Sequence, residues 1–415
     1  MQKKNGLLSQ YRGLRKEIYI LFFGRIVTNL GSMVWPMLTM ILSQKLGMNA
    51  SGIAVLMVAA SLIMMPANLL GGKLADRFDK KKIIIRCDCV SVVCYIVCGL
   101  VPLGYASVAL MLCASIFQQV EHPAYSALFA DLTTTADRER AYSLSYLGAN
   151  LGLVLSPTLA GLLFKNYLWL SFIISGVAIG CSTALIYFFV RDITPEPDEG
   201  SASVYQKSRG GESIWQIIRD NRIIVLYMII MALYFAAYRQ YNYLMPLDMG
   251  RVHGENGAVI FGTVSSLNCI VVVVFTPFIT RLFARMRETG KIITGEILVA
   301  AGYLLFLTLL GRIPVYYGAM LLFTWGEIFS TIADGPYLSS RIPASHRGRI
   351  NGVSAVAGTI ISGTCDLTVG RLYDNSGSAA AWSVVMGVLA LAIVLDGVFR
   401  NRDRKAYPRL YDFKM

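Results

Sequence analysis

The chain consists of about twelve long apolar stretches separated by short polar connections. A helix of about 20 apolar residues crosses the roughly 30 Å hydrocarbon core of a bilayer, and each stretch reaches that length. Only 15% of the residues are charged, against roughly 25% in soluble domains, and the mean hydropathy is +0.56. The pattern excludes a soluble globular domain and predicts an all-α polytopic membrane protein with 12 transmembrane helices. The spans are predicted near residues 18–42, 51–71, 83–103, 106–131, 141–164, 168–190, 222–247, 257–280, 292–311, 314–340, 350–372 and 379–399.

The net charge of +13 could suit a nucleic acid, but the positions of the basic residues indicate a membrane orientation signal instead. When both termini are placed in the cytoplasm, the basic residues in outer loops are Lys45, Lys165, Arg251 and Arg312. The basic N-terminal segment runs straight into a full-length span and lacks a small-residue cleavage site, so no removable signal peptide is expected. We predict a multi-pass protein of the cell (inner) membrane with cytoplasmic termini and no nucleic-acid partner.

The spans divide into two groups of six. Residues 1–190 are predicted to form an N-terminal six-helix bundle, 191–221 a cytoplasmic linker rich in Pro, Gly, Ser and charge, 222–399 a C-terminal six-helix bundle, and 400–415 a basic cytoplasmic tail. A weak internal repeat, at an offset of about 210 residues, matches Pro36 to Pro246 and indicates two pseudo-symmetric halves.

No reactive centre is recognised in the sequence. All eight cysteines fall inside predicted spans without metal-ligand spacing to histidine, which is typical of small apolar packing residues. There is no nucleophile paired with a base and no phosphate-binding loop. We expect that the protein is not an enzyme and has no metal site and no cofactor. We also expect a monomer. A transport-inactive sensor or a membrane-embedded enzyme is the alternative class.

The charged stretch "GGKLADRFDKKKIII" connects the second and third spans. It resembles the signature G-x-L-x-D-R-x-G-R-K-x of the major facilitator superfamily of secondary transporters. Gly72, Leu74, Asp76, Arg77, Lys80 and Lys81 fill the pattern, and Asp79 stands where the second glycine is usual, as in macrolide-efflux-like members. The resemblance implies a twelve-helix fold with two six-helix bundles around a central cavity, in which Asp76 and Arg77 act as a gate. From the residues alone, Gly72 permits close helix approach. The alternative is a solvated loop that only sets orientation.

The fifth span carries small residues at intervals of four, "GANLGLVLSPTLAGLL". Gly148, Gly152, Pro157 and Gly161 place small side chains and a proline along this helix, where backbones can approach closely. Members of the superfamily with a similar element tend to be antiporters, so the resemblance implies antiport. Plain helix packing is the alternative interpretation.

Acidic residues inside the spans are the proton-coupling candidates, because an ionised side chain at the bilayer centre costs at least about 2.5 kcal/mol. Glu327 and Asp334 lie two turns apart in the tenth span, and "GE" at Gly326 and Glu327 is similar to an element of lactococcal-type multidrug antiporters, where the Glu is a protonation site. Glu121 in the fourth span is a third candidate, with the alternative of a structural ion pair with Arg25. Asp366 is either pore-lining or structural.

Two further membrane acids, Asp88 and Asp396, lie within about two turns of the expected cytoplasmic ends of their spans. Side chains there can extend towards the headgroups, so both are predicted to be structural.

Polar and aromatic residues in the spans are candidates for lining a substrate cavity. Tyr234, Tyr238 and Tyr241 follow helical spacing in the seventh span beside Arg239, and aromatic faces receive cations and flat apolar ligands. An interfacial aromatic belt is the alternative. The candidates are Arg25, Asn29, Gln118, His122, Tyr146, Tyr238, Arg239, Tyr241, Asn242 and Trp325.

These features predict proton-coupled efflux of amphipathic, drug-like compounds by alternating access. The partners are a small-molecule substrate, protons and the lipid bilayer. The alternative is an exporter or flippase of a lipid-like, anionic or zwitterionic metabolite, in which Arg25 and Arg239 read a phosphate.

Overall fold

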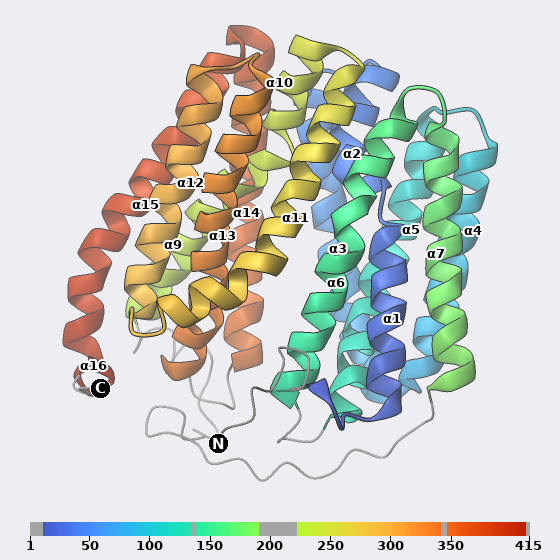
Figure 1. Cartoon of the computed structure of the whole chain (residues 1–415), viewed down its shortest axis with the longest axis horizontal. Helices are drawn as coiled ribbons and strands as arrows, with labels where there is room; N and C mark the ends of the chain where they lie inside the picture. Colours follow the sequence, from blue (N-terminus) through green and yellow to red (C-terminus); the bar gives the residue numbers. More distant parts are fainter. Residues whose placement is uncertain (1–10, 134–137, 191–221, 342–346, 412–415) are drawn as a thin grey trace, which may run out of the picture. The chain divides into compact units, whose positions relative to one another are not determined.

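The computed structural model describes residues 11–133, 138–190, 222–341 and 347–411 (Figure 1). The linker, the basic N-terminal segment up to residue 10 and the last residues of the tail lie outside the described part. Helices make up nearly all of the described chain, which contains no strand. The all-α prediction is therefore confirmed.

The described helices before the linker run in sequence along the N-terminal half. They are α1 (Lys16–Leu30), α2 (Val34–Met40), a π-helical turn (Ile41–Lys45), α3 (Ala50–Arg77), α4 (Lys80–Leu100), α5 (Tyr105–Asp131), α6 (Arg138–Phe164) and α7 (Leu168–Phe189).

The helices after the linker repeat this arrangement in the C-terminal half. They are α9 (Arg222–Tyr238), a 3-10 turn (Arg239–Tyr241), α10 (Leu244–His253), α11 (Asn256–Leu282), α12 (Glu288–Thr308), α13 (Ile313–Arg341), α14 (Arg347–Ser376), α15 (Ser378–Ala406) and the short α16 (Pro408–Tyr411).

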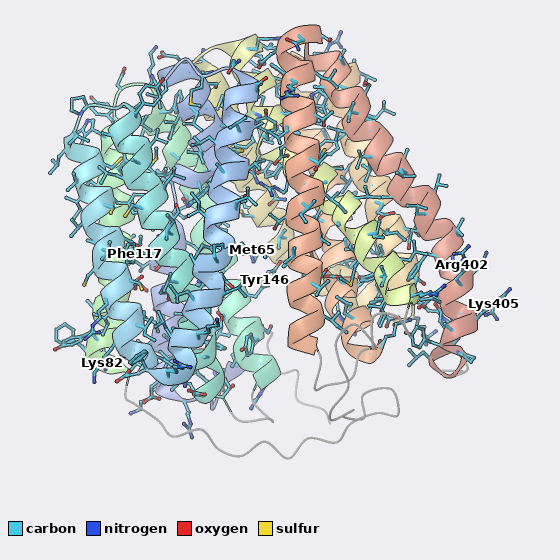
Figure 2. All side chains as sticks on the ribbon, turned by 180° about the vertical axis from the view of Figure 1, so that it is seen from behind. Met65, Lys82, Phe117, Tyr146, Arg402 and Lys405 are labelled. Carbon is cyan, nitrogen blue, oxygen red and sulfur yellow. The ribbon has the colours of Figure 1, made fainter. Side chains whose placement is uncertain are left out.

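Ten helical segments of the described chain are long and apolar enough to cross a membrane, and α5 and α13 bring the set of long segments to the predicted 12. Charged side chains such as Lys82, Arg402 and Lys405 lie towards helix ends (Figure 2). Large apolar side chains such as Phe23, Leu62, Phe188 and Val394 are exposed along the helices, as expected for surfaces that face lipid. The protein is a multi-pass membrane protein.

Two predicted spans are broken where continuous helices were expected. The first is interrupted between α1 and α2 at Gly31, where an added Cβ would lie 2.2 Å from the Cβ of Ala178. The Ser175 hydroxyl donates to the Gly31 carbonyl, which satisfies a backbone acceptor that the break releases. The seventh span is interrupted at Arg239–Tyr241, between α9 and α10. In the internal repeat these breaks are equivalent, and broken helices of this kind line binding sites in transporters.

Contacts group the chain into two compact units. The first unit contains α1, α2, most of α3, α4 to α7 and the first part of α11. The second unit contains the first turns of α3, α9, α10 up to Asp248, the rest of α11 and α12 to α16. Because α3 and α11 are each shared between the units, the division at residues 190 and 222 stays a prediction.

Each unit has its own core. The first unit buries Ile18, Leu21, Ile84, Ala124 and Leu144 in one apolar cluster. The second unit is dominated by aromatic side chains, in which the Trp382 ring lies 5.0 Å from Tyr303 and 5.7 Å from Phe306, between ring centroids. These cores fix the helices that carry the polar side chains described next.

Candidate functional site

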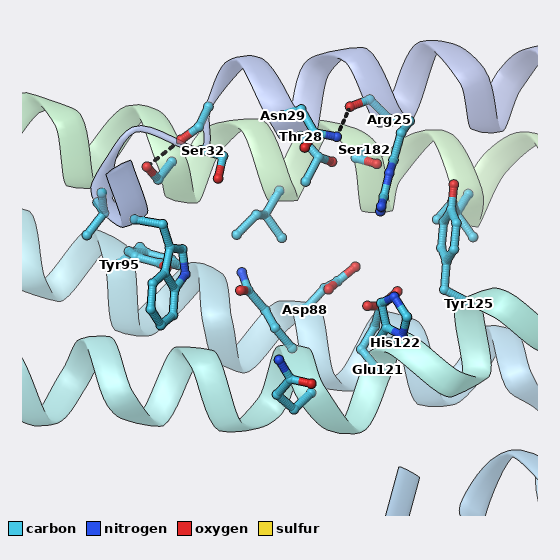
Figure 3. A pocket seen from close by; sticks show the side chains of 18 residues that line it. Arg25, Thr28, Asn29, Ser32, Asp88, Tyr95, Glu121, His122, Tyr125 and Ser182 are labelled. Carbon is cyan, nitrogen blue, oxygen red and sulfur yellow. Dashed lines mark hydrogen bonds between the residues drawn. The ribbon is translucent and has the colours of Figure 1, made fainter. Parts of the chain in front are cut away.

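A polar pocket of about 230 Å³ lies inside the first unit (Figure 3). Helices α1, α4, α5 and α7 supply its walls, and their polar side chains point inward although the helices are otherwise apolar. The polar residues that line it include Arg25, Thr28, Asn29, Asp88, Gln118, Gln119, Glu121, His122, Ser175 and Ser182. The structure thus brings together five residues predicted from sequence: Arg25, Asn29, Gln118, Glu121 and His122.

The charges of this pocket are spread over three helices. Arg25 extends from α1 towards Glu121 and His122 of α5 (Figure 3), and its guanidinium lies 5.6 Å from the centre of the Tyr125 ring. The charges of Arg25 and Glu121 interact, but no close ion pair joins these two described residues. Asn29 donates to the Arg25 carbonyl at 2.8 Å, so it fixes the α1 backbone as well as lining the pocket. The coupling role of Glu121 stays a prediction.

Asp88 and Asp396 do not extend towards the headgroups as expected, and their structural role stays a prediction. Asp88 lines the polar pocket, and its carboxylate accepts a hydrogen bond from the Thr183 hydroxyl of α7 at 2.6 Å. Asp396 is only 1% exposed. Distance from a helix end could not reveal this, because it ignores which way the helix face turns. The seven-residue spacing of Asp88 and Tyr95, which both line the pocket, is the sequence signal for a shared inward face.

An aromatic cavity of about 650 Å³ lies inside the second unit, between α9, α13 and α14. Its walls are mainly apolar, with Met231, Phe235 and Leu338 beside the rings of Tyr227 and Tyr238. Two charged side chains, Arg239 and Asp334, also line it. An apolar wall with a few fixed polar groups is the usual composition of a site for a small organic molecule.

The two charged groups of the aromatic cavity are held by neighbours. The Tyr227 hydroxyl donates to Asp334 at 2.6 Å. Arg239 lies 3.5 Å from Asp366, which is 2% exposed and also accepts a hydrogen bond from Gln240 at 2.8 Å. Asp366 is therefore a buried partner that anchors the 3-10 turn after α9, whereas the Asp334 carboxylate faces the cavity.

Glu327 is connected to the aromatic cavity through a tyrosine. It interacts with the side chain of Tyr238, which lines the cavity and stacks on Phe323 with 5.0 Å between ring centroids. Glu327 and Asp334 lie on the same helix, α13, as predicted. Asp334 lines the cavity wall, whereas Glu327 does not line it and reaches it through Tyr238.

Four of the predicted cavity residues line neither of these two cavities. Tyr241 is buried with its ring 5.2 Å from that of Phe323, and Trp325 lies 6.0 Å from Phe275, between ring centroids. Tyr146 is 48% exposed on α6, and Asn242 is exposed after the 3-10 turn. A substrate-contacting role for these four stays a prediction. Among the described residues, no group of three His, Cys, Asp or Glu side chains could hold a metal ion.

Residues 21–364 match the sequence pattern of the Major Facilitator Superfamily. The chain belongs to this superfamily. The match covers most of the chain, and it indicates a transporter rather than an enzyme.

The relatives of this chain include an antiporter and a drug-resistance protein. The chain is 23% identical over 365 residues to a Na(+), Li(+), K(+)/H(+) antiporter of Planococcus maritimus, covering 79% of this chain and 82% of the relative. It is 28% identical over 203 residues to the quinolone resistance protein NorA of Staphylococcus aureus, covering 47% of this chain and 49% of NorA. The chain thus matches about half the length of NorA.

The fold is shared with solved transporters. A POT family transporter in complex with 5-aminolevulinic acid superposes with a TM-score of 0.75, at 13% identity, over 97% of this chain and 98% of the other. At this identity the likeness shows the fold alone.

The superfamily signature between α3 and α4 is partly described. Lys80 pairs with Asp131 at the end of α5, at 2.8 Å, and the Asp79 carboxylate accepts from the Lys82 backbone N–H at 3.2 Å and so caps α4. The side chain of Asp76 lies outside the described part, and Arg77 is exposed. The gating role of Asp76 and Arg77 stays a prediction.

The predicted close approach at Gly72 is wrong. A Cβ added to Gly72 would meet open space, whereas one added to the preceding Gly71 would lie 2.3 Å from the Val120 carbonyl oxygen of α5. The two glycines are adjacent in sequence but lie about 100° apart around the helix, which the signature alone could not resolve.

The small residues of α6 make close helix contacts. A Cβ on Gly148 would lie 2.8 Å from the Phe22 ring, and one on Gly152 would lie 2.5 Å from the Ile26 carbonyl oxygen of α1. A Cβ on Gly161 would lie 2.5 Å from the Ala258 carbonyl oxygen of α11. These contacts account for the glycines by packing, and the antiport implication of the motif remains untested.

Proposed function

We propose that this transporter exports amphipathic, drug-like compounds in exchange for protons across the cell membrane. The observation that carries the proposal is the aromatic cavity, where the Asp334 carboxylate, held by Tyr227, faces walls made of Met231, Phe235 and Leu338. Apolar walls accept the body of an amphipathic compound, and a single carboxylate selects its cationic end.

One carboxylate can couple the two fluxes because proton and substrate compete for it. An ionised Asp334 attracts a cationic compound, and protonation of Asp334 removes that attraction and releases the compound. Each pH unit across the membrane supplies about 1.4 kcal/mol per proton. Net charge movement adds about 2.3 kcal/mol per 100 mV. Alternating access then carries the occupied and the protonated site in opposite directions.

Both relatives support parts of this proposal. The Planococcus maritimus relative exchanges monovalent cations for protons, and the Staphylococcus aureus relative confers quinolone resistance, according to their names. The proposed location is the cell (inner) membrane with both termini in the cytoplasm, and the proposed state is a monomer.

A second candidate is export of an anionic or zwitterionic metabolite. Arg239 favours it, because its side chain is 41% exposed at the aromatic cavity and offers a guanidinium to a phosphate or carboxylate. Asp366 opposes it, since this buried carboxylate already balances the charge of Arg239.

The test is transport by purified protein in proteoliposomes under imposed pH gradients. Ethidium is the cationic probe, a neutral lipophilic dye is the second probe, and the variant is Asp334→Asn. We expect the variant to lose pH-driven ethidium transport and to retain the neutral dye as a bound ligand. Glu288→Gln at the start of α12 is the control and keeps transport. Unchanged pH-driven ethidium transport in Asp334→Asn contradicts the proposal. Ethidium transport that is driven by a sodium gradient at constant pH would indicate that sodium, not the proton, is the coupling ion.

A further inference from the structure

Two carboxylates in the second unit are sealed away from both cavities. Glu296 on α12 is 0% exposed and Asp396 on α15 is 1% exposed. None of their four carboxylate oxygens has a hydrogen-bond partner in the described structure. Neither residue lines the polar pocket or the aromatic cavity.

The two residues belong to packed helices and interact with one another. Helices α12 and α15 contact each other, and the charge of Asp396 acts on Glu296. An acidic pair in this position is unusual, because buried carboxylates ordinarily have a cation or several N–H and O–H donors beside them.

The first unit has a counterpart of Glu296 that faces a polar pocket. Asp88 follows the start of α4 at Lys80 by eight residues, and Glu296 follows the start of α12 at Glu288 by the same number. Asp88 faces a polar pocket and accepts a hydrogen bond from Thr183 at 2.6 Å. The corresponding position in the second unit has neither the pocket nor the donor, so the two halves use this position differently.

An ionised carboxylate without a partner costs several kcal/mol inside a membrane protein, and two such charges side by side repel each other. A bound proton removes the charge and gives each carboxyl an O–H donor. We propose that Glu296 and Asp396 form a proton-binding site inside the C-terminal helices, separate from the aromatic cavity.

The groups that face this pair are consistent with a proton as the ligand. From α9, Tyr234 interacts with Glu296 and Tyr227 interacts with Asp396. On α15 itself, Arg400 and Asp403 act on Asp396 with opposite signs. Arg400 is exposed and Asp403 is bound to Arg341, so neither neutralises the pair directly.

Tyr227 also gives the pair a connection to the aromatic cavity. Its hydroxyl donates to Asp334, which faces the cavity from α13. Tyr227 also interacts with Asp396, although no hydrogen bond joins these two side chains, so Tyr227 lies between the buried pair and the cavity carboxylate. This connection to transport rests on the proposed function, whereas proton binding by the pair does not.

Infrared spectroscopy of the full-length protein in lipid tests the pair without any substrate. Protonated carboxyl groups have a C=O stretching band that ionised carboxylates lack, and the band moves on exchange into heavy water. At neutral pH we expect this band in the native protein and a loss of part of it in Glu296→Gln and again in Asp396→Asn. The control is Glu255→Gln, which removes an exposed carboxylate paired with Lys45 and leaves the band intact.

Two results overturn the proposal. One is a band that both variants retain unchanged, which means that the pair is ionised in the native protein. The other is loss of the native band when sodium replaces choline at constant ionic strength, which means that the pair binds a metal cation instead. If a variant does not fold, isotopic labelling of the glutamate and aspartate carboxyls in the native protein assigns the band without any substitution.

Transport separates this proposal from the proposed function. Retention of ethidium transport by Glu296→Gln together with loss of its dependence on the pH gradient assigns coupling to the pair. Failure of the native protein to transport any amphipathic probe overturns the proposed function, while the infrared result still decides whether the pair binds protons.

Discussion

The carboxylate of Asp403 holds Arg341 in a buried ion pair at the end of α13 and α15. Arg341 donates from Nε to Oδ1 at 3.0 Å and from a terminal nitrogen to Oδ2 at 2.8 Å, and the two side chains are 2% and 0% exposed. The hydroxyls of Tyr337 and Tyr411 donate to the same carboxylate at 2.7 and 2.6 Å. This cluster joins the short α16 to the C-terminal helices.

Neutralising Asp403 should leave an uncompensated guanidinium inside the protein. Because removal of one partner of a buried ion pair costs about 3–5 kcal/mol, Asp403→Asn is expected to lower the thermal unfolding temperature markedly in detergent. Glu288→Gln, at the half-buried first residue of α12, is the control and should change it little. Equal unfolding temperatures for native protein and Asp403→Asn would mean that Arg341 has another partner in solution.

The adjacent glycines of the α3–α4 signature provide a matched pair of substitutions. Gly71→Ala places a Cβ 2.3 Å from the Val120 carbonyl oxygen, and overpacking of this kind costs about 1–3 kcal/mol. Gly72→Ala meets open space and gains up to about 1 kcal/mol of helix propensity. Thermal unfolding of both variants checks that Gly71→Ala is less stable than Gly72→Ala. The reverse order would place the close helix contact at Gly72 after all.

The fold was predictable from sequence because each span is fixed by its own length and apolarity. The breaks at Gly31 and at Arg239–Tyr241 were not, since they depend on tertiary partners: Ala178 and Ser175 at the first break and Asp366 at the second. A run of apolar residues contains no information about a neighbouring helix that approaches within a few ångströms.

The candidate sites were predictable in part. Charged residues in apolar helices identified Arg25, Glu121, Arg239 and Asp334, and the structure places all four at cavity walls. The environment of Asp88 and Asp396 was not predictable from their distance to a helix end. It depends on whether the opposite helix supplies a donor, as Thr183 does for Asp88.

Asp248 is a buried acceptor that connects α10 with α14 and α15. It accepts hydrogen bonds from Tyr373 at 2.9 Å, Ser378 at 2.8 Å and the Trp382 indole at 2.6 Å. Asp248→Ala leaves these donors unsatisfied and should cost at least about 3 kcal/mol. Trp382→Phe is less informative, because it removes ring packing as well. Ser378→Ala, which removes one donor, should cost about 1 kcal/mol, and a larger loss for Ser378→Ala than for Asp248→Ala would contradict the assignment.

Tyr227 links the aromatic cavity to the interior of the second unit, and Tyr227→Phe isolates the contribution of its hydroxyl. The ring stacks on Tyr337 with 4.0 Å between centroids, so phenylalanine retains the packing and removes the donor to Asp334. We expect the apparent affinity for a cationic probe to change by about tenfold, as loss of a hydrogen bond to a charged group costs about 1.5 kcal/mol or more. Affinity for a neutral probe should stay the same. Equal effects on both probes would mean that Asp334 does not contact the substrate.

Glu255 at the turn between α10 and α11 carries the pH dependence that is simplest to measure. Its hydrogen bond and charge interaction with Lys45, at 3.1 Å, lower the pKa of this exposed carboxyl below its ordinary value of 4.5, and Lys165 lies 3.7 Å away. Because the pKa is lower in the folded state, the bridge contributes stability above the unfolded pKa and loses it as pH falls through the folded pKa. The difference in unfolding temperature between native protein and Glu255→Gln should therefore be constant from neutral pH to about pH 5 and shrink at more acidic pH. In a Lys45→Gln, Lys165→Gln background, this pH-dependent difference in unfolding temperature should disappear. A difference in unfolding temperature that grows on acidification would show instead that the carboxyl is stabilised in its protonated form.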